Sequence, residues 1–408
     1  MASIRPFRAL RPVPEAAARV SSVPYDVVNT EEARAQADGN PLSFLHVTRP
    51  EIDLPPGTDL YSDEVYAQAA RNFEQLKRAA PLVLEPEASL YFYRLSAGAH
   101  AQTGLAACYS LDEYDRGLIK KHEHTRRDKE DDRTRHMLEL RAQTGVVFLT
   151  YRAAAEVDAI ARHVCAEPPL YDFTAADGVT HTVWRVGPAD GAALAAAFGR
   201  IPALYIADGH HRAASAARAR AVLGGQGGEG EFDTMLAVAF PDDQVKILPY
   251  NRIVKDLAGQ TPSAFLAALE AKLPVRPGGP EPARQGEVSM YLGGHWYTLD
   301  LGPARPSGGD RTDRIEGLDV SVLQRAVLAD LLGIGDVRSD PRIDFVGGAR
   351  GAAALEQAVD SGRTAVAFSM FPVTVDDLMA IADAGGIMPP KSTWFEPKLR
   401  DGLLVHLI

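Results

Sequence analysis

Five consecutive residues, Asp208-Gly-His-His-Arg212, could bind a phosphate group. They follow an apolar run over 201–207 and precede an alanine-rich run over 213–223, a pattern that predicts a strand, a turn and a helix. The N-terminus of a helix attracts anions through its N–H groups and its dipole. Gly209 would allow a sharp turn and a close ligand approach.

The side chains of this motif would add to the anion site. Arg212 could hold two phosphate oxygens, and His210 and His211 would supply further donors. Asp208 could cap the helix or face a metal or a hydroxyl. The alternative is a capped helix with two incidental histidines. We favour the functional interpretation because strand–helix junctions carry many sites in α/β proteins.

A second segment, Lys120-Lys-His-Glu-His-Thr125, places a carboxylate between two imidazoles. Phosphoryl transfer to an alcohol needs a base that orients the hydroxyl and accepts its proton. Glu123, next to His122, is the best candidate for that base. The alternative is a solvated charge cluster that leads into a charged helix over 128–142.

A third segment, Met388-Pro-Pro-Lys-Ser-Thr393, differs from a Walker A loop, because Pro390 stands where that loop requires glycine. The two prolines predict a stiff, extended stretch. That stretch would present Lys391, Ser392 and Thr393 to a transferred phosphoryl group or a substrate phosphate. A surface loop packed over aromatic side chains is the alternative.

Alternating elements predict an α/β or α+β domain over residues 1–255. The expected strands cover 90–95, 145–151, 201–207 and 234–240, and the main helices cover 63–78 and 128–142. Gly224–Gly230 predicts a flexible loop. A smaller α/β domain over 256–408 would contribute the 390–393 loop. Its expected elements are helices over 262–273, 320–332 and 376–383, a hairpin over 288–299 and a strand over 364–369.

The bulk properties favour a cytoplasmic protein that binds small molecules. The chain has 408 residues and a formal net charge of −11, which disfavours nucleic acid as a partner. No stretch approaches the roughly 20 apolar residues of a membrane helix, so we expect no membrane partner. The two cysteines, Cys108 and Cys165, lack a metal-binding spacing.

The Asp208–Arg212 motif resembles the phosphate-binding motif of the ParB/sulfiredoxin-like fold, and its form is similar to that of the free-serine kinases, which use ADP or ATP. Sulfiredoxins carry a catalytic cysteine where this chain has His210. The serine kinases have a His-Glu pair upstream, matched here by His122 and Glu123, and the resemblance implies that Glu123 is the catalytic base. Their C-terminal P-K-[ST]-T segment is matched by Pro390–Thr393.

Nearly the whole chain resembles the DUF1015 family, on the three motifs together with Ile4–Phe7 and Val23-Pro-Tyr-Asp26. The resemblance implies a ParB/sulfiredoxin-like catalytic domain and a phosphotransferase with an alcohol group as acceptor. It suggests serine/O-phosphoserine interconversion with ADP or ATP, and Mg²⁺ is expected. Tyr25 could stack on a base, Asp26 could bind a metal or an amine, and Arg252 could contact phosphate.

Two other functions fit the same residues. A metal-dependent hydrolase could use the His, Glu and Asp side chains as ligands, although none shows the helical spacing of common zinc sites. A non-catalytic nucleotide-binding protein would use the anion site alone. The metal ligands, the acceptor and the oligomeric state stay open at this point.

Overall fold

The computed structural model describes residues 2–79, 82–224, 230–306 and 311–408, which form two compact units. Unit 1 consists of Met1–Lys121, Thr125–Val245 and Pro397–Ile408, and unit 2 of His122–His124 and Lys246–Glu396. The sequence predicts two domains divided at residue 255. The observed units differ from that division, because the C-terminal segment Pro397–Ile408 belongs to unit 1. Residues 225–229 of the expected glycine-rich loop lie outside the described residues.

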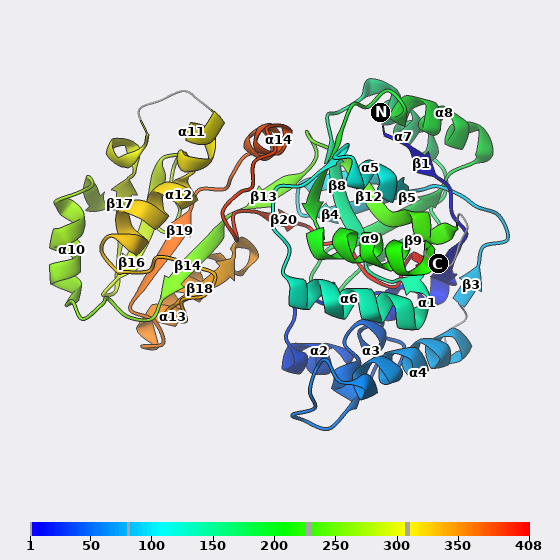
Figure 1. The fold of residues 1–408 in the computed structure, drawn as a ribbon, viewed down its shortest axis with the longest axis horizontal. Helices are drawn as coiled ribbons and strands as arrows, with labels where there is room; N and C mark the ends of the chain where they lie inside the picture. The colour runs from blue at the N-terminus through cyan, green and yellow to red at the C-terminus, as the bar shows by residue number, and fades with distance from the viewer. Residues whose placement is uncertain (1, 80–81, 225–229, 307–310) are drawn as a thin grey trace. The chain divides into compact units, whose positions relative to one another are not determined.

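A mixed sheet forms the centre of unit 1 (Figure 1). Strand β11 ends at Asp208 of the Asp208–Arg212 motif, and its neighbour β8 runs parallel to β12 and antiparallel to β11. The order along the sheet is β6 (Ile119–Lys120), β11 (Leu204–Asp208), β8 (Val147–Tyr151), β12 (Thr234–Pro241), β5 (His100–Ser110), β4 (Tyr91–Ala97), β10 (Thr180–Arg185) and β9 (Tyr171–Thr174), with β1 (Ile4–Arg5) paired to β5.

A smaller sheet in unit 1 ties the end of the chain to its beginning. Its order is β3 (Leu82–Leu84), β2 (Ala9–Pro12), β21 (Val405–Leu407) and β7 (Ala142–Gln143), and every pairing is antiparallel. Because β21 lies between β2 and β7, the C-terminal segment is an internal part of unit 1. This pairing places the residues just before β21 beside the N-terminal segment.

Helices cover the central sheet, and α9 (His210–Gly224) packs on β8, β12 and α6 (Arg127–Leu140). Helix α4 (Asp63–Ala79) packs on α6 in turn. The other helices are α1 (Pro14–Val20), α2 (Thr30–Ala37), α3 (Leu45–Thr48), α5 (Leu111–Asp115), α7 (Ala155–Val164), α8 (Pro188–Phe198), and the 3-10 turns Pro50–Asp53 and Glu231–Asp233. The core contains Leu149, Ile206 and Ala213, so it holds β8, β11 and α9 together.

Unit 2 is built on an antiparallel sheet. Its order is β15 (Val275–Pro277), β17 (His295–Asp300), β16 (Glu287–Leu292), β19 (Val366–Met370), β14 (Tyr250–Val254) and β18 (Ile343–Gly347), while β13 (Lys246–Leu248) pairs with β20 (Trp394–Glu396). The helical segments are α10 (Pro262–Glu270), α11 (Arg311–Glu316), α12 (Asp319–Leu323), the π-helical turn Gln324–Ala329, α13 (Gly351–Asp360), α14 (Val375–Asp383), and the 3-10 turns Gly302–Ala304 and Gly348–Arg350.

These elements confirm the mixed α/β class that the sequence predicts. The hairpin is confirmed as well, since Leu292 pairs with His295 across Gly293 and Gly294, which both have positive φ. The helix expected to begin at 213 starts earlier, at His210. Within the described residues, no helix combines the length and the apolar character required to cross a membrane.

Candidate functional site

The Asp208–Arg212 motif lies at the junction of β11 and α9 in unit 1. Strand β11 ends at Asp208, Gly209 has a φ of +91°, and α9 begins at His210. The two histidines and Arg212 therefore form the first turn of the helix. Helix geometry directs the amide N–H groups of that turn out of the helix end, which is the arrangement that attracts an anion.

Arg212 is buried beneath this junction and is held by two segments of unit 1. Its Nη2 donates to Asp26 Oδ1 at 2.7 Å and its Nη1 donates to the carbonyl of Val146 at 2.8 Å. The guanidinium carbon also lies 5.6 Å from the centre of the Tyr25 ring. Tyr25 and Asp26 thus meet the Asp208–Arg212 motif. To bind two phosphate oxygens through Nη1 and Nη2, Arg212 would have to release the Val146 carbonyl and the Asp26 carboxylate.

Asp208 is oriented by a lysine from the C-terminal segment. Its Oδ2 accepts from Lys398 Nζ at 2.8 Å, and its Oδ1 accepts from the backbone N–H of Gly209 at 2.8 Å. Burial would raise the pKa of Asp208, but the charges of Lys398 and Arg212 hold that pKa well below its ordinary value. The carboxylate is therefore ionised at neutral pH and is part of a charged cluster.

A cavity of about 30 Å³ lies between Arg212 and Asp401. Two buried atoms of its lining residues, Arg212 Nε and Asp401 Oδ2, have no hydrogen-bond partner among the described residues. Burial, with a smaller effect of the nearby Asp26, raises the pKa of Asp401 to about 7 against the opposing charge of Arg212. Asp401 is therefore poised to change its charge near neutral pH. Other polar residues that line the cavity are Tyr25, Thr48, Arg133, His136 and Thr144.

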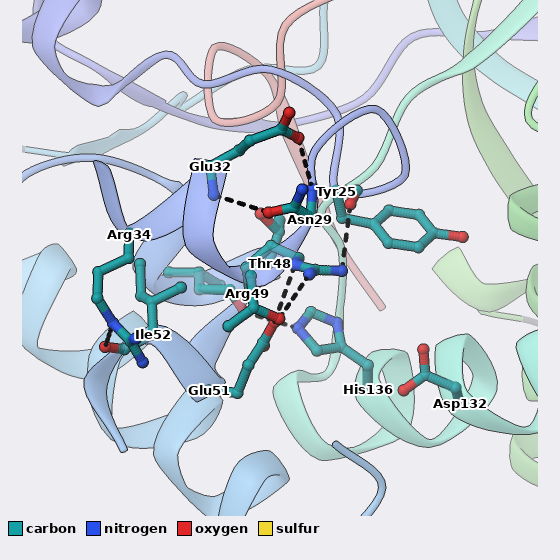
Figure 2. Close-up of polar contacts among 12 residues, drawn as sticks. Tyr25, Asn29, Glu32, Arg34, Thr48, Arg49, Glu51, Ile52, Asp132 and His136 are labelled. Carbon is teal, nitrogen blue, oxygen red and sulfur yellow. Dashed lines mark hydrogen bonds and ion pairs between the residues drawn. The ribbon is translucent and has the colours of Figure 1, made fainter. Parts of the chain in front are cut away.

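A groove beside this cavity is lined by a network of paired charges. Figure 2 shows five of its lining residues, Tyr25, Arg49 and Glu51 together with Asp132 and His136 of α6. Arg49 pairs with Glu51 at 2.9 Å, and Asp132 accepts from Tyr66 Oη at 2.8 Å. Burial, with the charge of Arg133, lowers the pKa of His136 to about 4, so its imidazole is neutral.

The charged helix predicted over residues 128–142 is exposed to solvent on only part of its surface. Asp132, Thr134 and His136 are buried against other parts of unit 1, and Arg133 pairs with Asp132 at 2.8 Å. The same helix has exposed charged residues, such as Asp128 and Glu139. One face of α6 thus contributes to the lining of the cavity, while the other meets solvent.

The second and third motifs meet within unit 2. The backbone N–H of Met388 donates to the carbonyl of His122 at 2.8 Å, and Thr393 Oγ1 lies 3.4 Å from His122 Nε2. Ser392 Oγ donates to the carbonyl of Pro389 at 2.6 Å, so this hydroxyl closes the 389–392 turn. The segment that carries Glu123 is thereby attached to the loop that carries Lys391.

Arg252 of β14 holds the same loop from inside unit 2. Its Nη2 donates to the carbonyl of Lys391 at 3.0 Å, and its Nη1 donates to the carbonyl of Tyr250. Lys391 itself has a φ of +57°, which is unusual for a residue with a side chain. Its ammonium lies 5.2 Å from the centre of the Tyr250 ring.

The predicted site residues thus fall into two groups. Unit 1 contains Asp208–Arg212, whereas unit 2 contains His122, Glu123 and the 391–393 loop. Sequence reasoning missed Lys398, Asp401 and Arg133 as members of the first group. Lys398 and Asp401 lie a few residues after the third motif, and their assignment requires the pairing of β21 with β2, which no local pattern predicts.

Replacing Gly209 with alanine should destabilise unit 1 by about 1–3 kcal/mol, because a Cβ is strained at this φ. The added Cβ would also lie 3.4 Å from Arg212 Cδ and from Val147 Cα. The loss of stability is measured as a loss of hydrogen-exchange protection of the backbone amides in β8 and β12. Gly187→Ala is the matched control, since Gly187 has no positive φ and no atom within 4 Å of the added Cβ. Equal protection in both variants would contradict the prediction.

Comparison with known proteins assigns the chain to a family. The family model described as "Protein of unknown function (DUF1015)" matches residues 4–321, and the chain belongs to this family. A search of curated proteins gives no match.

Several solved structures are similar to the chain at low identity. A conserved hypothetical protein from Pyrococcus furiosus is 15% identical with a TM-score of 0.36, over 74% of this chain and 95% of its own. A free serine kinase in complex with AMP is 14% identical with a TM-score of 0.36, over 73% and 91%. SbnI from Staphylococcus aureus, with a C-terminal truncation, is 13% identical with a TM-score of 0.39, over 74% and 87%.

Proposed function

We propose that this protein is a nucleotide-dependent phosphotransferase that transfers a phosphoryl group to or from the hydroxyl of a small metabolite. Serine and O-phosphoserine, with ATP and ADP, are the first pair to test. The observation that supports the proposal is the strand–helix junction at Gly209, where α9 begins next to the buried Arg212, an arrangement suited to binding an anion.

In this proposal the first-turn residues, Gly209 to Arg212, bind the phosphates of the nucleotide. Glu123 orients the acceptor hydroxyl and takes its proton, and His122 positions the Glu123 segment through its contacts with Met388 and Thr393. Lys391, Ser392 and Thr393 contact the transferred phosphoryl group or the substrate.

Magnesium fits the carboxylates around Arg212. Asp26 and Asp208 are both partly exposed, and Mg²⁺ prefers oxygen ligands shared with substrate phosphates. When bound, the ion would neutralise phosphate charge. The lysine partner of Asp208 keeps this carboxylate ionised, and Arg212 keeps Asp26 in place. The Asp208 carboxylate would therefore be available in the charged form that the ion requires.

The direct test is an assay of the purified full-length protein with labelled ATP and Mg²⁺ against a panel of amino and hydroxy acids that begins with serine. The reverse reaction, O-phosphoserine with ADP, belongs to the same panel. Transfer to one acceptor, dependent on the added acceptor, is the expected result. Nucleotide binding with no transfer in either direction would overturn the proposal and favour a non-catalytic binding protein. Stoichiometric zinc that survives purification would favour a hydrolase instead.

A further inference from the structure

Unit 1 contains an open pocket that takes no part in the proposed function. Its volume is about 560 Å³, which lies within the range of small-molecule sites. None of its lining residues belongs to the Asp208–Arg212 motif, to the segment 120–125 or to the 390–393 loop. Most of the lining side chains are apolar, and they belong to Ile4, Pro6, Ala88, Leu90, Val186, Pro188, Ala192 and Ala195.

The walls of the pocket come from segments that backbone hydrogen bonds join. Phe7 and Ser89 exchange two N–H···O bonds, of 3.1 and 3.0 Å, and the N–H of Val186 donates to the carbonyl of Leu90 at 2.9 Å. Helix α8 begins two residues after Val186 and packs on β1 (Figure 1). The scaffold itself therefore holds the pocket open, and a ligand would bind to a largely pre-formed site.

Arg185 is the one cation among the described lining residues, and its position is fixed. Its Nε donates to Ser89 Oγ at 2.9 Å, and its Nη1 lies 3.1 Å from Glu85 Oε2. Glu85 also pairs with Arg11, at 2.5 Å between Oε1 and Nε, so two guanidinium groups share one buried carboxylate. The Arg185 side chain is 39% exposed. A fixed and accessible guanidinium group therefore stands beside a mainly apolar surface.

We infer that this pocket binds a small molecule that carries a carboxylate on an apolar body. The carboxylate would accept hydrogen bonds from Arg185, whose planar group matches carboxylate geometry. The apolar body would contact the exposed Pro6, Pro188 and Ala192 and remove them from water. This site goes beyond the proposed phosphoryl transfer and does not depend on it.

Glu87 also lines the pocket and is exposed, so its carboxylate could bind an ammonium group. The ligand could therefore come from two sources, an apolar amino acid or a carboxylic acid without an amino group. Both share the carboxylate on an apolar body. Glu87→Gln distinguishes them, because only an amino acid would lose affinity in this variant.

The alternative is a passive surface depression in which Arg185 only holds Glu85 and Ser89. In that role Arg185 would stabilise unit 1, but no carboxylate would bind in a saturable way. A ligand site predicts instead that binding requires both the positive charge at residue 185 and free space beside α8.

The test measures binding of 3-phenylpropionate and of L-phenylalanine to the full-length protein by ligand-observed NMR titration at constant ionic strength. Arg185→Gln should lower the affinity for the tighter ligand at least about tenfold, because a charge-assisted contact is lost. Ala192→Trp fills the pocket while Arg185 stays, and should lower the affinity by at least as much. Ala193→Trp is the matched control, since Ala193 is exposed on the same helix but does not line the pocket.

The inference is overturned if the wild-type protein shows no saturable binding of either compound up to about 10 mM. Equal affinities in Ala192→Trp and Ala193→Trp would overturn it as well. So would competition by ADP, because the ligand would then occupy the proposed nucleotide site. Thermal melts without ligand show which variants are folded, and if Arg185→Gln is not, the two tryptophan variants decide. No readout involves phosphoryl transfer, so the proposed function can fail while this site stands.

Discussion

Replacing Glu123 with glutamine is expected to lower the rate of phosphoryl transfer by about 100- to 10,000-fold, the range that a positioned general base contributes. Glutamine keeps the size and the hydrogen-bonding capacity of the side chain but cannot accept the proton of the acceptor hydroxyl. Nucleotide affinity should change little, because the proposed phosphate-binding groups belong to the start of α9. The measurement compares kcat and the dissociation constant for ADP in the variant and in wild type.

Glu270→Gln is the matched control for this variant, since Glu270 is an exposed glutamate at the end of α10 in the same unit. The control should keep wild-type kcat. A Glu123→Gln protein with more than about a third of wild-type kcat would exclude Glu123 as the base, since general-base catalysis contributes far more than this factor. A joint loss of ADP binding and activity would instead assign Glu123 a role in the nucleotide site.

Replacing Asp401 with asparagine should remove a large pH dependence from the stability of unit 1. The pKa of Asp401 is about 7 in the folded protein and about 3.9 in an unfolded chain, so the folded state binds the proton more tightly. The free energy of unfolding therefore falls as pH rises from about 4 to about 7. The full loss is on the order of 4 kcal/mol, from about three pKa units at 1.36 kcal/mol each.

Asparagine is neutral at every pH, so the variant should lack this slope. We expect Asp401→Asn to be more stable than wild type at pH 8, by a margin that shrinks steadily as the pH falls toward 4. Hydrogen exchange of the β8 and β12 amides, measured from pH 5 to pH 8, reports unit 1 alone. Asp38→Asn, at an exposed aspartate, should leave the wild-type slope intact. A variant that loses stability with pH as steeply as wild type would show that Asp401 is already ionised below pH 5.

Local patterns predict the elements of this protein well, because each depends on neighbours in the chain. The apolar run before Asp208 and the glycine pair at 293–294 specify a strand–helix junction and a hairpin, and both form. The sequence predicts a start of α9 three residues later than His210, where the helix begins, because a histidine pair gives little helical signal. His210, His211 and Arg212 nevertheless form the first turn of α9.

The composition of the candidate site could be predicted only in part. The three motifs have the residue types that anion binding and proton transfer require, and unit 2 brings the second and third together at His122 and Thr393. The partners that set the electrostatics come from distant segments. Asp26 meets Arg212 across 186 residues of sequence, and Lys398 meets Asp208 across 190. Only the tertiary pairing of the strands brings such residues together.

The return of residues 397–408 to unit 1 has a consequence for the order in which the protein can fold. Strand β21 fills the gap between β2 and β7, and Lys398 and Asp401 reach the start of α9 by the same route. A ribosome must therefore finish all of unit 2 before unit 1 receives its last strand. Until then the edges of β2 and β7 that pair with β21 stay unpaired, and such edges are prone to pair with other chains.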